Sequence, residues 1–110
     1  MRSKRTKSLD IPTRVKKTVW ARDGECCVIC GDHTAMPNAH YIPRSQGGLG
    51  IEENVVTLCA EHHHMYDQTT KRAEIKKILR RYLQSKYRGW TEEKLCYSKW
   101  KIPKDDERAL

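Results

Sequence analysis

The sequence predicts a small α+β domain whose centre is held together by a metal ion. Three observations support this fold class: the length, two short apolar stretches on either side of a glycine-rich turn, and two cysteine-containing pairs. With 110 residues, of which 37% are apolar and none is Phe, the chain is long enough for one domain. A domain of this size buries roughly two-thirds of its unfolded surface, so its own core is small. Five Cys and five His indicate a metal as an added source of stability.

The chain begins with a basic segment and continues into a helix. Residues 1–11 are basic and polar without periodicity, so we expect an arm that is disordered or that becomes ordered on a partner. Pro12 suits a first helical turn, apolar residues follow at helical spacing as far as Trp20, and Gly24 is a stop signal. These signals predict a helix over residues 12–22.

A strand, a turn and a returning strand are expected in the middle of the chain. Residues 26–31 resemble a tight knuckle, and residues 39–42 are typical of a short strand. A glycine-containing turn over residues 43–50 leads to a second strand over residues 54–58. A helix is expected to follow over residues 59–67.

The C-terminal part carries a clear helical stripe. Apolar residues recur at positions i, i+3, i+4, i+7 and i+8, namely Ile75, Ile78, Leu79, Tyr82 and Leu83. The opposite face is basic and is a candidate DNA-binding surface formed by Lys76, Lys77, Arg80 and Arg81. A short capped helix is expected over residues 91–95. The single domain thus spans residues 12–101, with a helical C-terminal extension, and residues 102–110 form a flexible tail.

Charge is strongly segregated along the chain. The net charge is +7 over residues 1–22, −6 over residues 23–70 and +8 over residues 71–101. Acidic groups attract cations and basic arms attract phosphate backbones, so double-stranded DNA is the expected partner. No apolar run approaches the roughly 20 residues that span a bilayer, and no signal peptide follows the first residues. We therefore expect a soluble, cytoplasmic protein with no membrane partner.

The cysteines form a zinc-binding pattern. Two pairs, each with two residues between its members, are separated by 28 residues and comprise Cys27, Cys30, Cys59 and His62. This spacing lets all four side chains close on one tetrahedral ion, which leaves no position for a substrate, so the zinc would be structural. A disulfide framework is disfavoured by the odd cysteine count and the absence of a signal peptide. A thioredoxin-like redox pair would leave the second pair without a purpose.

A second cation site is indicated by the remaining histidines. His63 and Asp67 stand four residues apart on the expected helix and therefore share a face that can bind a divalent cation such as Mg²⁺ or Mn²⁺. His40, on the expected strand, is a candidate general base for the attack of water on a phosphodiester. Asn54 can fix the loop backbone beside it, and Arg44, just after the strand, is a candidate phosphate contact.

These residues carry a resemblance to the HNH endonucleases. The run Ala-His40-Tyr-Ile-Pro-Arg-Ser-Gln-Gly-Gly, then Asn54-Val-Val-Thr-Leu-Cys, then Glu-His-His63 gives the order His, Asn, His with 13 and 8 intervening residues. The resemblance covers about residues 15–68 and extends to the subgroup whose ββα-metal core is clamped by zinc. It implies a metal-dependent enzyme that cuts or nicks DNA, with His40 as general base, Asn54 as structural Asn and His63 as metal ligand.

The chain departs from the family pattern at two positions. Many members have Asp or His immediately before the general base as a metal ligand, where this chain has Ala39. Asp67, Asn38 or water would then have to supply the missing ligand. The second zinc pair ends in His62 instead of the more frequent Cys, and zinc accepts either. The chain is similar to phage and prophage HNH proteins, some of which act beside the packaging terminase. A non-catalytic zinc-dependent DNA-binding module, or an adaptor for a packaging motor, is the alternative.

Overall fold

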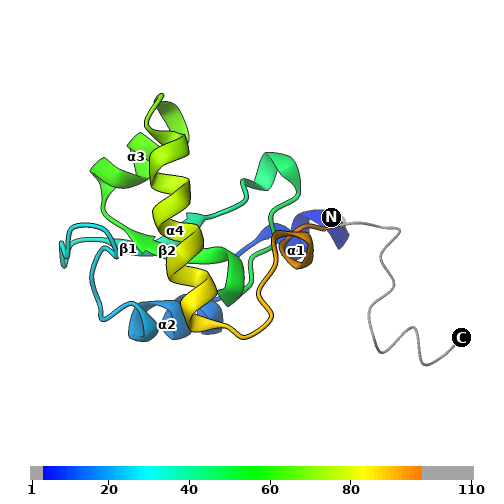
Figure 1. The fold of residues 1–110 in the computed structure, drawn as a ribbon. Coiled ribbons are helices and arrows are strands. Elements are labelled where there is room, and N and C mark those ends of the chain that lie inside the picture. Colours follow the sequence, from blue (N-terminus) through cyan, green and yellow to red (C-terminus); the bar gives the residue numbers. More distant parts are fainter. Residues whose placement is uncertain (1–3, 98–110) are drawn as a thin grey trace, which may run out of the picture.

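Two antiparallel strands and the helix that follows them form the centre of the fold. The structure is a computed structural model, and it describes residues 4–97. Its helices and strands, in chain order, are α1 (Lys4–Leu9), α2 (Thr13–Arg22), β1 (Met36–His40), β2 (Val55–Leu58), α3 (Ala60–Gln68) and α4 (Arg72–Lys86). Short 3-10 turns lie at Arg44–Gln46, Glu52–Asn54 and Glu92–Leu95. Figure 1 shows α4 crossing the sheet, with α2 beneath it and α3 above. The architecture is that of a small α+β domain.

The sheet is short and irregular on one side. Ala39 pairs with Val56 and His40 with Val55, whereas the next pair along is Met36 with Leu58. One extra residue therefore lies on β1 between Met36 and Ala39, which is a β-bulge. Bulges bend a strand and redirect its side chains, and this one comes just before His40.

Every residue of β2 is buried, because helices cover the sheet on both faces. On one face, Val55 packs against Val15 and Val19 of α2, which are one helical turn apart. On the other face, Val56 and Leu58 join the main cluster, to which α4 contributes the buried residues Ile75, Leu79 and Leu83. The strand therefore alternates its side chains between two small cores, as strand geometry requires.

A buried polar network links α2 to the sheet and to α4. The Asp23 carboxylate accepts hydrogen bonds from the Thr57 backbone N–H (2.8 Å), the Tyr82 hydroxyl (2.6 Å) and Arg22 Nε (2.7 Å). The Arg22 guanidinium also donates to the carbonyls of Glu52 and Val55. Both charged side chains are nearly or fully buried, so their hydrogen bonds replace the water that they lose. The network connects three parts of the chain that are distant in sequence.

Two glycines allow separate segments to cross at close range. A Cβ at Gly48 would overlap the carbonyl of Ile42, and a Cβ at Gly50 would overlap the carbonyl of Asp10. The C-terminal segment closes the same loop, since Leu49 N–H donates to the Leu95 carbonyl at 2.8 Å. The loop after β1 is thus held on both sides by backbone contacts that leave no room for a side chain.

The elements follow the expected order, namely α2, β1, β2, α3 and α4. The structure differs from the prediction in the N-terminal arm, residues 1–11, which was expected to be disordered or to become ordered on a partner. Residues 4–9 form α1, and the Leu9 side chain is only 2% exposed, so this segment packs against the domain. The expected strand 39–42 begins earlier, at Met36, and ends at His40. The predicted flexible tail, residues 102–110, lies outside the described residues. Among residues 4–97, no helix is both long and apolar enough to cross a bilayer.

Replacing Asp23 with Ala should strongly destabilise the domain. The substitution leaves Arg22 as an uncompensated buried cation and removes the acceptor of the Thr57 N–H. Breaking one partner of a buried ion pair costs about 3 kcal/mol or more, and urea unfolding would measure this loss. Asp32→Ala removes an exposed carboxylate and should change the free energy of unfolding by about 1 kcal/mol or less. Equal effects of the two substitutions would contradict a structural role for the network.

Candidate metal centre and the adjacent cleft

The four predicted zinc ligands come together from two places in the fold. Cys27 and Cys30 lie in the loop between α2 and β1, where the Gly31 N–H donates to the Cys27 carbonyl (2.8 Å) and closes a tight turn. Gly31 has a φ of +80°, a left-handed conformation that glycine adopts without strain. Cys59 is the N-cap of α3, and His62 lies in its first turn. The end of β2 and the start of α3 therefore face the cysteine loop.

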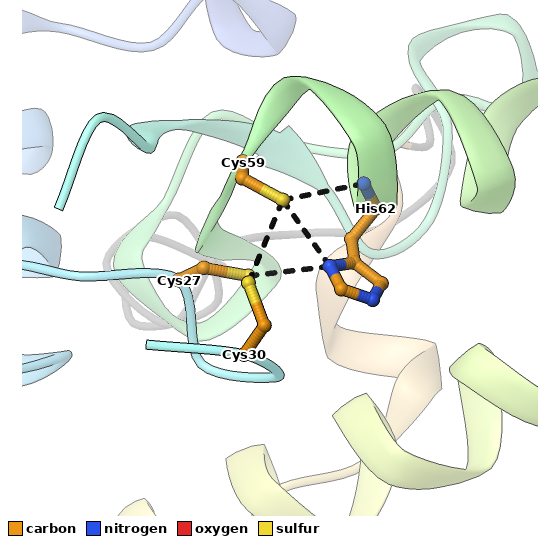
Figure 2. Close-up of side chains that lie close together, drawn as sticks. All are labelled: Cys27, Cys30, Cys59 and His62. Carbon is orange, nitrogen blue, oxygen red and sulfur yellow. Dashed lines mark hydrogen bonds between the residues drawn. The ribbon is translucent and has the colours of Figure 1, made fainter. Parts of the chain in front are cut away.

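The four ligand atoms are spaced as the corners of a metal site. They all lie within 4.8 Å of one another. Individual separations are 3.7 Å for Cys30 Sγ to Cys59 Sγ, 3.9 Å for Cys27 Sγ to His62 Nδ1 and 3.2 Å for Cys59 Sγ to His62 Nδ1. A tetrahedron with Zn–S arms of about 2.3 Å has edges of about 3.8 Å. Figure 2 shows these side chains pointing toward a common centre.

The thiols of Cys27 and Cys30 influence each other's pKa at this centre. Burial disfavours the charged form of Cys27, but hydrogen bonds from the backbone N–H groups of Cys30, Cys59 and Ile29 and from the Cys30 thiol outweigh it and lower the pKa of the Cys27 thiol. The Asp32 N–H favours the Cys30 thiolate, yet desolvation and the thiols of Cys27 and Cys59 raise the pKa of Cys30 to about 11. Several thiolates so close together repel one another, and a bound cation removes that penalty.

The donor set therefore fits a metal ion such as zinc. Three sulfurs and one imidazole are the ligands of a closed, structural zinc site. All five cysteines are free of disulfides, and Cys26 and Cys96 lie outside the cluster. The disulfide framework weighed from the sequence is absent among residues 4–97.

A separate cleft of about 540 Å³ lies beside β1 and α3. The predicted general base His40, on β1, lines it together with His63 and Asp67 of α3. The predicted phosphate contact Arg44 also lines it, as does Arg72 from the first turn of α4. The structure thus brings the predicted base, cation ligands and phosphate contact to one concave surface.

His40 is held by a backbone carbonyl from the N-terminal segment. Its Nε2 lies 2.8 Å from the Leu9 oxygen, which can only accept a hydrogen bond. The neutral ring therefore carries its proton on Nε2 and a free lone pair on Nδ1. Burial lowers the pKa of His40 below its ordinary value of 6.5, although the bond to Leu9 works in the opposite direction. A neutral imidazole with a defined acceptor nitrogen is suited to removing a proton from water.

Asn54 fixes the loop that follows His40. It is completely buried, and its Oδ1 accepts a hydrogen bond from the Ile42 N–H at 2.8 Å. Its Nδ2 donates to the carbonyls of Ile42 (3.2 Å) and Leu49 (2.9 Å). Asn54 makes no contact with the cleft, so its part is to position the end of β1.

His63 and Asp67 form a pair that is spaced to share one cation. His63 Nε2 lies 2.9 Å from Asp67 Oδ2, and both side chains are partly exposed. Adjacent ligands of an octahedral Mg²⁺ ion, with arms of about 2.1 Å, are about 3 Å apart. Within residues 4–97, no third Cys, His, Asp or Glu joins them, since the zinc-type cluster is the one such group of three or more.

The predicted DNA-binding residues of α4 do not form a single surface. Lys77 and Arg81 are exposed, whereas the half-buried Lys76 places its ammonium 5.7 Å from the centre of the Tyr41 ring. Arg80 Nε lies 3.8 Å from a Glu92 carboxylate oxygen. The four cations thus point in at least two directions along the helix.

Sequence reasoning missed Arg72, which lines the cleft, and Leu9, which holds the His40 ring. Leu9 acts through its backbone carbonyl, which carries no residue-specific signal in a sequence. Arg72 donates to the Tyr66 carbonyl at 2.9 Å and lies 4.0 Å from Asp67. Arg72 lies one helical turn before Lys76 and therefore shares its helix face. Extending the predicted basic face by one turn would have identified Arg72 as a candidate.

No known family model, curated protein or solved structure matches this chain.

Removing the metal should unfold the domain. A structural zinc site contributes on the order of 10 kcal/mol, so a chelator in excess should abolish the cooperative thermal transition. Cys59→Ala should do the same, and the purified wild type should contain one equivalent of zinc by elemental analysis. Cys26→Ala, which leaves the four ligands intact, should keep both the zinc and the melting temperature. A Cys59→Ala variant that melts like the wild type would show that the cluster is not structural.

The tautomer of His40 can be measured directly. Nitrogen-15 chemical shifts of the imidazole should report a protonated Nε2 and an unprotonated Nδ1 at neutral pH, because Leu9 accepts from Nε2. His33 should report the opposite tautomer, protonated on Nδ1, because its Nδ1 lies 3.0 Å from the Glu25 carbonyl. A proton on Nδ1 of His40 would contradict the arrangement.

Proposed function

We propose that this protein is a metal-dependent endonuclease or nickase that hydrolyses phosphodiester bonds of double-stranded DNA. The observation that supports it is that His40 of β1 and the His63–Asp67 pair of α3 line the same cleft. A proton acceptor facing a candidate cation site is what hydrolysis of a phosphodiester by water requires.

In this proposal His40 is the general base. Its Nδ1 accepts a proton from a water molecule whose oxygen forms a bond to phosphorus. The bond from phosphorus to the leaving ester oxygen breaks, and that oxygen takes up a proton from solvent. The Leu9 carbonyl holds the imidazole in one orientation, and Asn54 fixes the backbone of Ile42 just after it, so little reorganisation is needed.

The cation ligands in this proposal are His63 and Asp67. A bound Mg²⁺, Mn²⁺ or similar ion would polarise the phosphate and stabilise charge on the leaving oxygen. Arg44 and Arg72 line the same cleft and would bind the remaining phosphate oxygens through their guanidinium groups. The Arg44 Nη1 contact with Asp10, 2.8 Å long and exposed, would then compete with the phosphate.

DNA is the proposed substrate because of charge and because of the resemblance. The chain carries a formal net charge of +8. Basic residues attract a polyanion, and the resulting affinity should fall steeply as salt rises. Lys77 and Arg81 are the exposed α4 cations that would contact the backbone, with Lys76 and Arg80 at the edge of that contact.

The proposal also assigns the chain to the zinc-clamped ββα-metal proteins of the HNH type. The order β1, β2, α3 with a Cys/His cluster at the start of the helix supports the assignment. A cytoplasmic location and a phage packaging motor as a protein partner belong to the same proposal, and both rest on the sequence resemblance.

A non-catalytic zinc-dependent DNA-binding module is the second candidate. It is favoured by Ala39, whose buried methyl group occupies the position of a family metal ligand. This candidate requires DNA binding that is independent of added divalent metal and no cleavage with any cation.

Plasmid nicking distinguishes the candidates. The wild type should convert supercoiled DNA to the open circle with Mg²⁺, Mn²⁺ or another divalent ion, and His40→Ala should lower the rate at least 100-fold, as for loss of a general base. DNA affinity and melting temperature should change little. His33→Ala, at an exposed histidine outside the cleft, is the matched control and should cut like the wild type. If His40→Ala cuts as fast as the wild type, the general-base assignment is wrong.

A further inference from the structure

One buried polar atom at the cleft has no hydrogen-bond partner. Asn38 Oδ1 is inaccessible to solvent and unpaired, and among the described residues only Thr57 Oγ1 shares this property. Leaving a buried carbonyl-type oxygen without a partner costs about 1–3 kcal/mol, so such atoms in a stable protein call for a ligand or an ordered water.

The position of Asn38 distinguishes it from Thr57. Asn38 lines the same cleft as His40, His63 and Asp67, whereas Thr57 is completely buried on β2. Asn38 also lies in the β-bulge between Met36 and Ala39, where the regular direction of side chains along β1 is interrupted. Bulges next to functional sites commonly redirect one side chain.

The neighbouring residue cannot supply a ligand. Ala39 is fully buried in the main core and has only a methyl group. The His63–Asp67 pair therefore provides two ligand atoms 2.9 Å apart, and any third protein ligand would come from elsewhere in the cleft. A side-chain amide oxygen is a hard ligand of the kind that Mg²⁺ and Mn²⁺ accept.

We infer that Asn38 Oδ1 is the third protein ligand of a divalent cation held by His63 and Asp67. The inference rests on the cation site of the proposed function and does not depend on cleavage. It places one ligand on the bulge of β1 and two on α3, so the cation would bridge the strand and the helix beside His40.

Calorimetric titration of Mn²⁺ into the full-length protein, with the cysteine cluster filled by zinc, tests the assignment. Asn38→Leu keeps the approximate size, removes the oxygen and should weaken Mn²⁺ binding at least tenfold. Asn38→Asp adds a negative charge at the same place and should tighten binding, a gain that misfolding cannot produce. Thr57→Val removes the other unpaired atom and is the matched control, which should bind Mn²⁺ like the wild type.

The outcomes separate this inference from the proposed function. Unchanged Mn²⁺ affinity in Asn38→Leu, with its zinc content and melting temperature intact, would overturn the ligand assignment and leave an ordered water as the partner of Oδ1. Failure of the Asp variant to bind more tightly would also count against it. A wild type that binds Mn²⁺ through Asn38 yet never nicks DNA would overturn the nuclease proposal and leave the cation site standing.

Discussion

The convergence of the cysteine loop on the first turn of α3 is the constraint on which the rest of this structure depends. Only 37% of the residues are apolar, and the sheet has two short strands, so hydrophobic burial alone gives a small core. Cys59 and His62 belong to the element that also carries His63 and Asp67. Fixing the start of α3 against the loop therefore fixes the direction in which the next two side chains face the cleft.

A second linkage acts on another part of β2. The Arg22–Asp23 network connects α2, β2 and α4 through buried hydrogen bonds. The cysteine cluster holds one end of β2 and this network holds the middle and the beginning of the strand. Since β2 pairs with β1, the two linkages together determine where His40 lies relative to α3. The two linkages thus act on the strand and the helix that carry His40, His63 and Asp67.

Local sequence signals predicted the elements and the cysteine cluster well, because ligand spacing and helical periodicity act over a few residues. The stripe ending at Leu83 and the start of a helix near Cys59 are of this kind. Contacts between distant segments were not predictable. Leu9 reaches His40 through a backbone atom 31 residues away, and Asp23 meets Tyr82 across 59 residues, a pairing that no local pattern indicates. The disorder expected at the N-terminus was inferred from composition, which does not register the burial of a single leucine.

The glycines at the crossings of the loop have a consequence for how such a sequence can diverge. At Gly48 and Gly50 the neighbouring carbonyls occupy the space of any Cβ. Glycine is therefore required at both positions by the path of the backbone, independently of any activity of the protein. Distant descendants that had lost their histidines, and with them any activity, would still be expected to retain both positions. In an evolutionary comparison, conservation of these two glycines would indicate a shared fold. Conservation at positions 38, 40, 63 and 67 would indicate a retained activity.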